Sequence, residues 1–483
     1  MRRINNVALV SLGLLLGTAG CTSFLTGEKL TSDPNLPSVV SAQQLFVAVQ
    51  AGQFAFEEGT VAMMMCEWVQ ACAAANGRFV QQAGQYVFGE TSNIGANGGD
   101  WLSVYDAGGL ADIRQIKAAT QAAGDSTWLG ITKIWEAFTV GTASDMWGDI
   151  PYSQVTTTAT PALDNRFAIL ASIQTLLSEA VTELGSGHGP GPGSSDLVLG
   201  GDPVAWAKVA HTLKARYFMH TAESLGTPAY TSAITEALLG ISDNTGASDF
   251  SSFHTAATSE RNMWAQFQTS SGFGTDLEAG KFLVDYMNSR TDPRLASYFC
   301  KNASNTYGGD DFNSPQPPSS VSNFACLPPR FSATARIPYV SYAENELILA
   351  EAYAATGDAA NALVHLNNEL ATVPLPAVPS GLTAAQLRDT VMMEKYVAMF
   401  QNIESINDYR RTCIPAVTVV TNQQGFTHVP GRLFYPQNER NVNPNIPDAS
   451  TTLGPVDLAN HWDGNFFRNP GDQHACQGSD NAP

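Results

Sequence analysis

The sequence predicts a mainly α-helical protein built from tetratricopeptide-like helix pairs, with an irregular, partly β region inserted between them. Three observations indicate this fold class. Apolar residues recur at helical spacing in segments such as residues 128–142 and 201–221. Residues 345–370 place small and apolar side chains at the spacing of one tetratricopeptide repeat, in which two antiparallel helices approach closely. Residues 240–329 lack this periodicity and are rich in Ser, Asn, Gly and aromatic residues.

The first 20 residues are predicted to be a signal peptide, because two arginines precede an apolar run that is too short to span a membrane permanently. The run ends in the sequence TAGC, which is similar to a lipobox and makes Cys21 the predicted lipidation site. Acyl chains such as palmitate on Cys21 would anchor the protein to a membrane through residues 21–40. An ordinary secretory signal followed by a chance cysteine is the alternative.

Residues 41–239 form the predicted N-terminal helical region. Helices are expected in residues 41–52, 61–75, 101 to about 123, 128–142 and 201–221, and Asp202 is expected to cap the last of them. One further helix is expected to begin after a cap at Asn165 or Asp164. The segment SDMWGDIPYSQ, residues 144–154, must leave helical geometry abruptly. Gly148 frees the backbone there, and Pro151 restricts Ile150 to extended conformations. Trp147 and Tyr152 are expected to hold this corner against neighbouring helices.

Residues 240–329 are predicted to be an irregular inserted region. Residues 330–483 are predicted to hold the C-terminal tetratricopeptide-like helices and an extended tail. A helix is expected from residue 384 to residue 405. The prolines in residues 432–447 predict extended and turn backbone without helix.

The cysteines other than Cys21 are even in number, which in an exported chain predicts disulfides. We prefer the pairing in which each bond closes a loop within one region: Cys66 with Cys72, Cys300 with Cys326, and Cys413 with Cys476. A regular helix would hold Cys66 and Cys72 in poor geometry, so this pairing requires the helix expected there to break. Metal binding is the competing interpretation, and the absence of C-x2-C and H-x3-H spacings argues against it.

The composition is that of a folded and strongly acidic protein. Of the 483 residues, 44% are hydrophobic and 14% are charged, and the net charge is -19. Binding to nucleic acid rewards lysines and arginines that neutralise phosphates, and the sequence has no basic cluster. We therefore expect no nucleic-acid partner.

Five segments resemble, in the same order, elements of the SusD/RagB family of nutrient-binding outer-membrane lipoproteins. They are WGDIPYSQ from residue 147, GDPVAWAKVAHTLKARY from residue 201, RTDPRLASYF from residue 290, EKYVAMFQNIESINDYRR from residue 394, and RLFYPQNERNVNPN from residue 432. The fourth segment departs from the family pattern at residues 402–404. The resemblance implies a SusD-like α-superhelix. It also implies a lipid-anchored outer-membrane protein, facing the cell surface, that captures an oligosaccharide or peptide and closes as a lid over a SusC-like TonB-dependent transporter.

The sequence has no G-x-S-x-G, H-E-x-x-H, P-loop or G-x-G-x-x-G motif after a strand. We expect a binding protein with no enzymatic activity and no cofactor. Two alternatives stay open. A glycan-degrading surface hydrolase would use a carboxylate pair that is visible only in space, and a tetratricopeptide-type adaptor would bind a protein partner.

Aromatic and polar residues in the irregular segments are the candidate ligand contacts, because aromatic faces stack on sugar rings while polar groups pair with hydroxyls. One predicted cluster contains Phe79, Tyr86, Phe88, Asn93 and Asn97. The other contains Arg261, Asn262, Trp264, Phe273 and Tyr307. Each aromatic residue taken alone is more often a core residue than a ligand contact.

The acidic segment GGDDFN is the one place where the sequence raises the question of calcium. Asp310, Asp311 and Asn313 carry oxygen ligands, yet they do not form a full calcium-binding series. We expect a solvated loop and predict no metal site.

Overall fold

The computed structural model describes residues 40–87, 89, 99–106, 108–270, 274, 276–420 and 429–446. The helices of the first half are α3 (Ala42–Glu57), α4 (Thr60–Trp68), α5 (Gly99–Tyr105), α6 (Leu110–Ala123), α7 (Ser126–Trp147), α8 (Arg166–Ser186), α9 (Pro203–Met219), α10 (Ala222–Leu225) and α11 (Thr227–Ala237). Those of the second half are α12 (Met263–Thr269), α13 (Lys281–Ser289), α14 (Leu295–Tyr298), α15 (Tyr342–Ala355), α16 (Ala359–Leu370), α17 (Ala384–Ala398), α18 (Glu404–Thr412) and α19 (Gln437–Val442).

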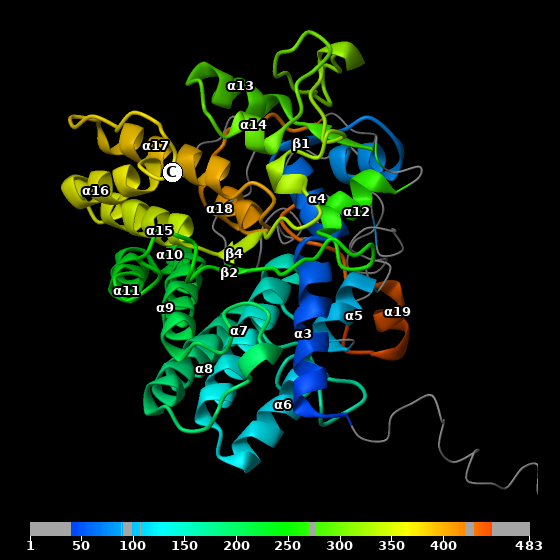
Figure 1. The fold of residues 1–483 in the computed structure, drawn as a ribbon, viewed down its shortest axis with the longest axis vertical. Coiled ribbons are helices and arrows are strands. Elements are labelled where there is room, and N and C mark those ends of the chain that lie inside the picture. Colours follow the sequence, from blue (N-terminus) through cyan, green and yellow to red (C-terminus); the bar gives the residue numbers. More distant parts are fainter. Residues whose placement is uncertain are drawn as a thin grey trace, which may run out of the picture.

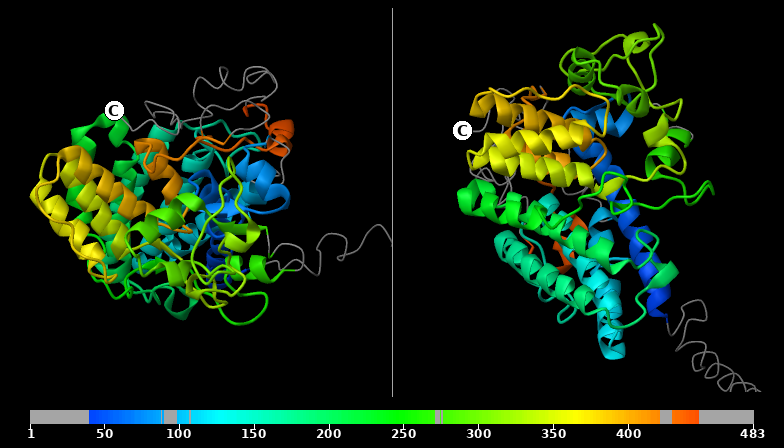
Figure 2. Two further views of the ribbon diagram at one scale, coloured as in Figure 1. Left: turned by 90° about the horizontal axis from the view of Figure 1, so that it is seen from above. Right: turned by 60° about the vertical axis from the view of Figure 1, so that its left-hand side comes forward.

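The long helices pack against one another in chain order and form the predicted superhelix. Helix α7 contacts α8, α8 contacts α9, α9 contacts α11, α11 contacts α15, and α15 contacts both α16 and α17 (Figure 1). The right-hand view of Figure 2 shows these green, yellow and orange helices as successive layers. Helix α3 packs against α4, α5 and α6 beside this series. The predicted fold class, a mainly α protein of tetratricopeptide-like helix pairs, is confirmed.

Polar caps begin the helices where the sequence indicates. Asn165 accepts hydrogen bonds from the backbone at the start of α8, and Asp202 does so at the start of α9, with Pro203 in the first turn. Ser41 forms a capping box with Gln44 at the start of α3. Each cap satisfies backbone N–H groups that have no partner within the helix.

Besides the helix expected over residues 61–75, which ends at Trp68, two helices expected to be continuous are interrupted, and those predictions were wrong. The helix expected from residue 101 to residue 123 breaks into α5 and α6 at Gly108, where φ is +97° and a Cβ would lie 2.6 Å from the Ala48 carbonyl oxygen. The close approach of this turn to α3 requires glycine. The helix expected over residues 384–405 breaks into α17 and α18, and Gln401 between them has φ +71°.

The C-terminal segment also differs from expectation, because the short helix α19 forms where prolines were predicted to exclude helix. Pro436 occupies the N-cap position of α19, with φ of −64°. The missing N–H of proline removes no helical hydrogen bond at this position, since the first N–H groups of a helix have no partner within the helix.

Two short antiparallel pairs make the irregular region partly β, as expected. Strand β1 (Cys72–Ala74) pairs with β3 (Leu277–Ala279), and β2 (Phe250–Ser251) pairs with β4 (Pro338–Val340). The second pair joins the start of the irregular region to the segment just before α15. The exact division of the chain at residues 240 and 330 stays a prediction.

Two of the predicted disulfides are present, Cys66–Cys72 and Cys300–Cys326. The first forms because α4 ends at Trp68 and Gln70 takes a positive φ, which breaks the helix as the pairing required. Cys413 is also disulfide-bonded. Its predicted partner Cys476 and the predicted lipidation site Cys21 lie outside the described residues, so those two assignments stay predictions.

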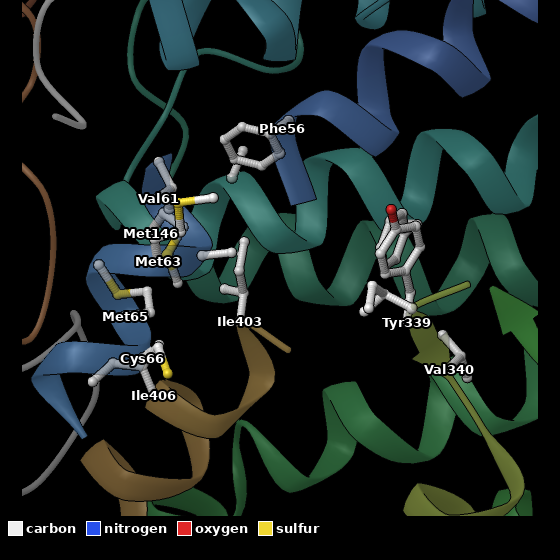
Figure 3. Close-up of a cluster of buried hydrophobic side chains, with 14 of the residues drawn as sticks. Phe56, Val61, Met63, Met65, Cys66, Met146, Tyr339, Val340, Ile403 and Ile406 are labelled. Carbon is white, nitrogen blue, oxygen red and sulfur yellow. The ribbon is translucent and has the colours of Figure 1, made fainter. Parts of the chain in front are cut away.

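The corner at residues 144–154 is packed as predicted. Helix α7 ends at Trp147, and Gly148 follows with φ +85°. The fully buried Trp147 ring stacks on Phe56, and its Nε1 donates to the Phe434 carbonyl oxygen at 3.1 Å. Next to this corner, side chains of α3, α4, α7 and α18 meet in the core that Figure 3 shows, where Met63, Met146 and Ile403 lie beneath Phe56.

Among the described residues, α8 alone has the length and apolar composition of a membrane-spanning helix. Its apolar stripe, which includes Ile173 and Leu177, is buried against α7 and α9. We therefore assign α8 to the protein core.

Candidate functional site

A cavity of about 190 Å³, here called the α13 pocket, lies at the start of α13. Its lining combines aromatic rings, carboxylates, an amide and an ammonium group. It is lined by Gln70, Cys72, Lys281, Phe282, Asp285, Asp310, Asp311, Phe312 and Thr418.

Backbone hydrogen bonds hold the acidic loop against β3 and α13. The Asp310 N–H donates to the Ala279 carbonyl oxygen, and the Lys281 N–H donates to the Asp310 carbonyl oxygen, both at 2.8 Å. Gly309 permits this approach, since a Cβ on it would lie 2.4 Å from the Cα of Lys281. The loop that was predicted to be solvated therefore forms one wall of the pocket.

Two partly buried aromatic rings line the α13 pocket, Phe282 and Phe312. Phe312 lies directly over Gly84, where a Cβ would be 2.2 Å from the ring. Phe282 packs edge-on against Tyr396 at 6.0 Å between ring centroids. Both rings are thus held in place by the protein while part of each stays accessible.

The carboxylates of the pocket differ in their partners. Asp285 pairs with Lys281, and both side chains are substantially exposed. Asp311 Oδ1 accepts the Asn313 N–H at 2.8 Å, and Asp310 Oδ1 accepts the Gln316 N–H at 2.5 Å. Burial, together with the charge of Asp310 and a hydrogen bond to it, raises the pKa of Glu278 beneath the pocket to about 8.

A second cavity, of about 440 Å³, is here called the α3 pocket. It lies between the outer face of α3 and the segment before α12, and its walls are mostly apolar. It is lined by Val47, Ala51, Phe54, Ala55, Leu197, Phe253, His254, Thr255, Ser259, Glu260, Arg261, Met263 and Gln266.

Four of the predicted ligand residues lie in the core. Phe79, Tyr86, Asn262 and Trp264 have no exposed surface. Phe79 packs edge-on against Phe267 at 5.2 Å, and Trp264 packs against Phe331 at 5.4 Å. Asn262 caps α12, and its side-chain amide donates to the Glu58 carboxylate at 3.0 Å.

The other predicted ligand residues are divided between places. Arg261 is partly buried and lines the α3 pocket, whereas Tyr307 is partly buried beside α13, where its carbonyl oxygen accepts the Asn288 amide at 3.0 Å. Phe88, Asn93, Asn97 and Phe273 lie outside the described residues. A ligand contact for any member of the two clusters stays a prediction.

Sequence reasoning missed Phe282, Asp285, Lys281 and Phe312. The first three lie within one short helix, whose pattern carries no sign that one face lines a cavity. Phe312 lies in the acidic loop that was considered only for calcium. An aromatic residue within an acidic, glycine-containing loop was the one available signal.

In the part of the chain that the structure describes, one group of side chains has the spacing of metal ligands: Asp145, His220 and Glu404. All three are buried. His220 Nδ1 lies 2.9 Å from Asp145 Oδ2, and its Nε2 lies 2.6 Å from Glu404 Oε1. Burial lowers the pKa of His220, but the two carboxylates outweigh this effect and raise it to about 9. The imidazolium therefore occupies the position of a cation and links α7 to α18.

A family model described as "Starch-binding associating with outer membrane", SusD-like_2, matches residues 34–436. The chain belongs to the SusD-like family. The resemblance noted from the sequence motifs is thereby confirmed. No curated protein matches the chain in sequence.

Solved structures share the SusD-like fold with this chain at low sequence identity. A SusD/RagB family protein from Bacteroides thetaiotaomicron is 18% identical, with 92% of this chain and 100% of that chain covered and a TM-score of 0.67. A SusD homologue from Bacteroides fragilis is 16% identical, with 86% of this chain and 98% of that chain covered and a TM-score of 0.69. A chitin-binding SusD homologue from Flavobacterium johnsoniae is 18% identical, with 91% and 98% covered and a TM-score of 0.65.

Proposed function

We propose that this SusD-like protein binds a neutral oligosaccharide at the α13 pocket. The observation that carries the proposal is the placement of two accessible aromatic rings, Phe282 and Phe312, in one cavity with the carboxylates of Asp285 and Asp311 and the amide of Gln70. Aromatic faces bind the C–H faces of sugar rings, and carboxylates accept hydrogen bonds from hydroxyls. The acidic lining disfavours anionic glycans.

The size of the pocket suits one ring of a longer chain. Sites that enclose a drug-sized ligand have volumes of about 300–1,000 Å³, and the α13 pocket has about 190 Å³. One sugar would enter the pocket while its neighbours extend over the surface. Capture would be non-covalent, with no cofactor and no chemical step.

The proposed setting is the outer membrane. The protein would be lipid-anchored at Cys21, face the cell surface and act as a lid for a SusC-like TonB-dependent transporter. Family membership and the description of the family model support this setting. Co-purification of a large β-barrel protein from detergent-solubilised membranes is the expected result. Its absence, under conditions that preserve other outer-membrane complexes, would contradict the lid role.

Isothermal titration with starch and chitin oligosaccharides tests the binding site. We expect saturable binding that Phe312→Ala weakens by about tenfold, because the variant loses one stacking face. Phe167→Ala is the matched control, since Phe167 is a partly buried phenylalanine in the first turn of α8 and lines neither pocket. Equal affinity of Phe312→Ala and the parent protein would refute the site. Shortened oligosaccharides in a chromatogram of the incubated mixture would instead support the hydrolase alternative.

A further inference from the structure

We propose that the α3 pocket is a second, separate binding site, for a small ligand that has an apolar body and a single carboxylate. The proposal does not depend on the oligosaccharide site, because the two pockets share no lining residue. With about 440 Å³, the α3 pocket lies within the range of volumes, about 300–1,000 Å³, of sites that enclose small molecules.

The walls of the α3 pocket expose apolar surface to its interior. Val47, Ala51 and Ala55 follow one another at four-residue spacing and form an exposed stripe on α3. Phe253 faces this stripe and is 41% exposed, while Val47 is 40% exposed. Covering these accessible side chains with the apolar body of a ligand contributes a favourable binding free energy of roughly 25 cal/mol per Å² of surface removed from water.

The guanidinium group of Arg261 supplies positive charge at the polar end of the α3 pocket. Arg261 uses its Nε to donate to the Ala256 carbonyl oxygen at 3.2 Å. Within the described residues, the ion pairs include none with Arg261. Arginine has five N–H donors in a planar fork, so its outer nitrogens keep the geometry that binds a carboxylate through two hydrogen bonds.

The side chains of His254 and Glu260 at this end are engaged with the protein. His254 lies 3.0 Å from the Glu58 carboxylate through Nε2, and its Nδ1 lies 3.3 Å from the Glu260 carbonyl oxygen. The Glu260 carboxylate accepts the Thr255 hydroxyl at 2.6 Å. Unlike His254, Arg261 therefore keeps hydrogen-bond donors that it can offer to an anion.

The loop that carries Arg261 is braced on both sides. The Thr255 N–H donates to the Glu260 carbonyl oxygen at 3.1 Å, and Gln266 Nε2 donates to the Arg261 carbonyl oxygen at 2.7 Å. Next along the chain, the Asn262 N–H donates to Ala333 and its side chain is fully buried. Such bracing lowers the entropy that binding must overcome. An apolar pocket with one preorganised arginine selects an apolar monocarboxylate over a polyhydroxylated sugar.

Isothermal titration of the full chain with 4-phenylbutyrate tests this proposal, with 4-phenylbutanol as the uncharged analogue and acetate as the analogue without an apolar body. We expect phenylbutyrate to bind about tenfold more tightly than phenylbutanol, because of the charge-assisted hydrogen bonds, and acetate to show no saturable binding. Arg261→Gln should abolish the preference for the acid and leave phenylbutanol binding unchanged. Ala51→Trp, which fills the pocket from the exposed face of α3, should abolish both.

Arg388→Gln is the matched control, because it removes an accessible arginine far along the chain on α17. A short apolar peptide with a free C-terminal carboxylate, compared with its amide, distinguishes a peptide terminus from a free acid as the source of the carboxylate. Equal affinity for acid and alcohol, or a preference that survives Arg261→Gln, would overturn the proposal. Starch and chitin oligosaccharides should bind Ala51→Trp as they bind the parent, which separates this site from the oligosaccharide site.

Discussion

His220 should make the stability of this protein depend on pH in the mildly alkaline range. Its imidazole lies between Asp145 and Glu404, and its pKa in the folded protein is about 9, against an ordinary value of 6.5. Because the folded pKa is the higher one, the stabilisation is complete below pH 6.5 and is lost as the pH rises through 9. The difference of about 2.5 units corresponds to roughly 3 kcal/mol of unfolding free energy, at about 1.4 kcal/mol per unit.

Denaturant unfolding at pH 6.5 and at pH 9.5, on the parent and on His220→Gln, measures this contribution. Other buried groups titrate in the same window: burial raises the pKa of Glu57 to about 8 and that of Glu369 to about 9. Because these folded-state pKa values lie above the ordinary value of 4.5, rising pH up to those values also lowers the unfolding free energy, in both proteins. The decisive quantity is therefore the stability difference between parent and variant.

We expect that difference to shrink by roughly 3 kcal/mol between the two pH values, since deprotonated His220 no longer pairs with the two carboxylates. Thermal unfolding over the same range should show the two melting temperatures converging. A difference that stays constant with pH would refute the assignment of an imidazolium to His220. A stability difference that grows as the pH rises would show that His220 is neutral in the folded protein.

Three further predictions concern packing, cross-linking and the oligosaccharide site. Trp147→Ala should lower the unfolding free energy by about 3–5 kcal/mol, because the ring is fully buried. Unchanged thermal stability together with lost ligand affinity would instead assign Trp147 to ligand binding. Replacing both Cys300 and Cys326 with serine should lower the unfolding free energy by about 3 kcal/mol in denaturation without reductant. The difference from the parent should vanish in reductant, and a difference that persists there would show that the lost disulfide is not its cause. Gly84→Ala should displace Phe312 and weaken oligosaccharide binding, measured by titration, whereas parent-like affinity would show that this ring position does not matter.

Local sequence determined much of the helical framework, because helical periodicity, capping and turn formation depend on residues a few positions apart. Asn165 and Asp202 begin their helices as predicted, and the chain turns at Gly148 as predicted. The breaks at Gly108 and Gln401 were missed. The first of these depends on the approach of a turn to α3, which no local pattern contains.

Tertiary structure alone decided which aromatic and charged residues line a cavity. Phe79, Tyr86 and Trp264 come from irregular segments, as ligand contacts often do, yet they pack into the core. An exposed and a buried aromatic residue in an irregular segment have the same local sequence pattern.

The α13 pocket joins residues that are distant in the sequence: Gln70 bonds to the carbonyl oxygen of Thr418, which lies 348 positions later. Its second ring, Phe312, comes from a loop that is aligned by backbone hydrogen bonds to β3 and α13. The sequence by itself therefore determined most of the long helices, the corner, two disulfides and the family. Only long-range packing decided where the pockets lie, because each pocket is lined by residues from segments that are far apart in the sequence.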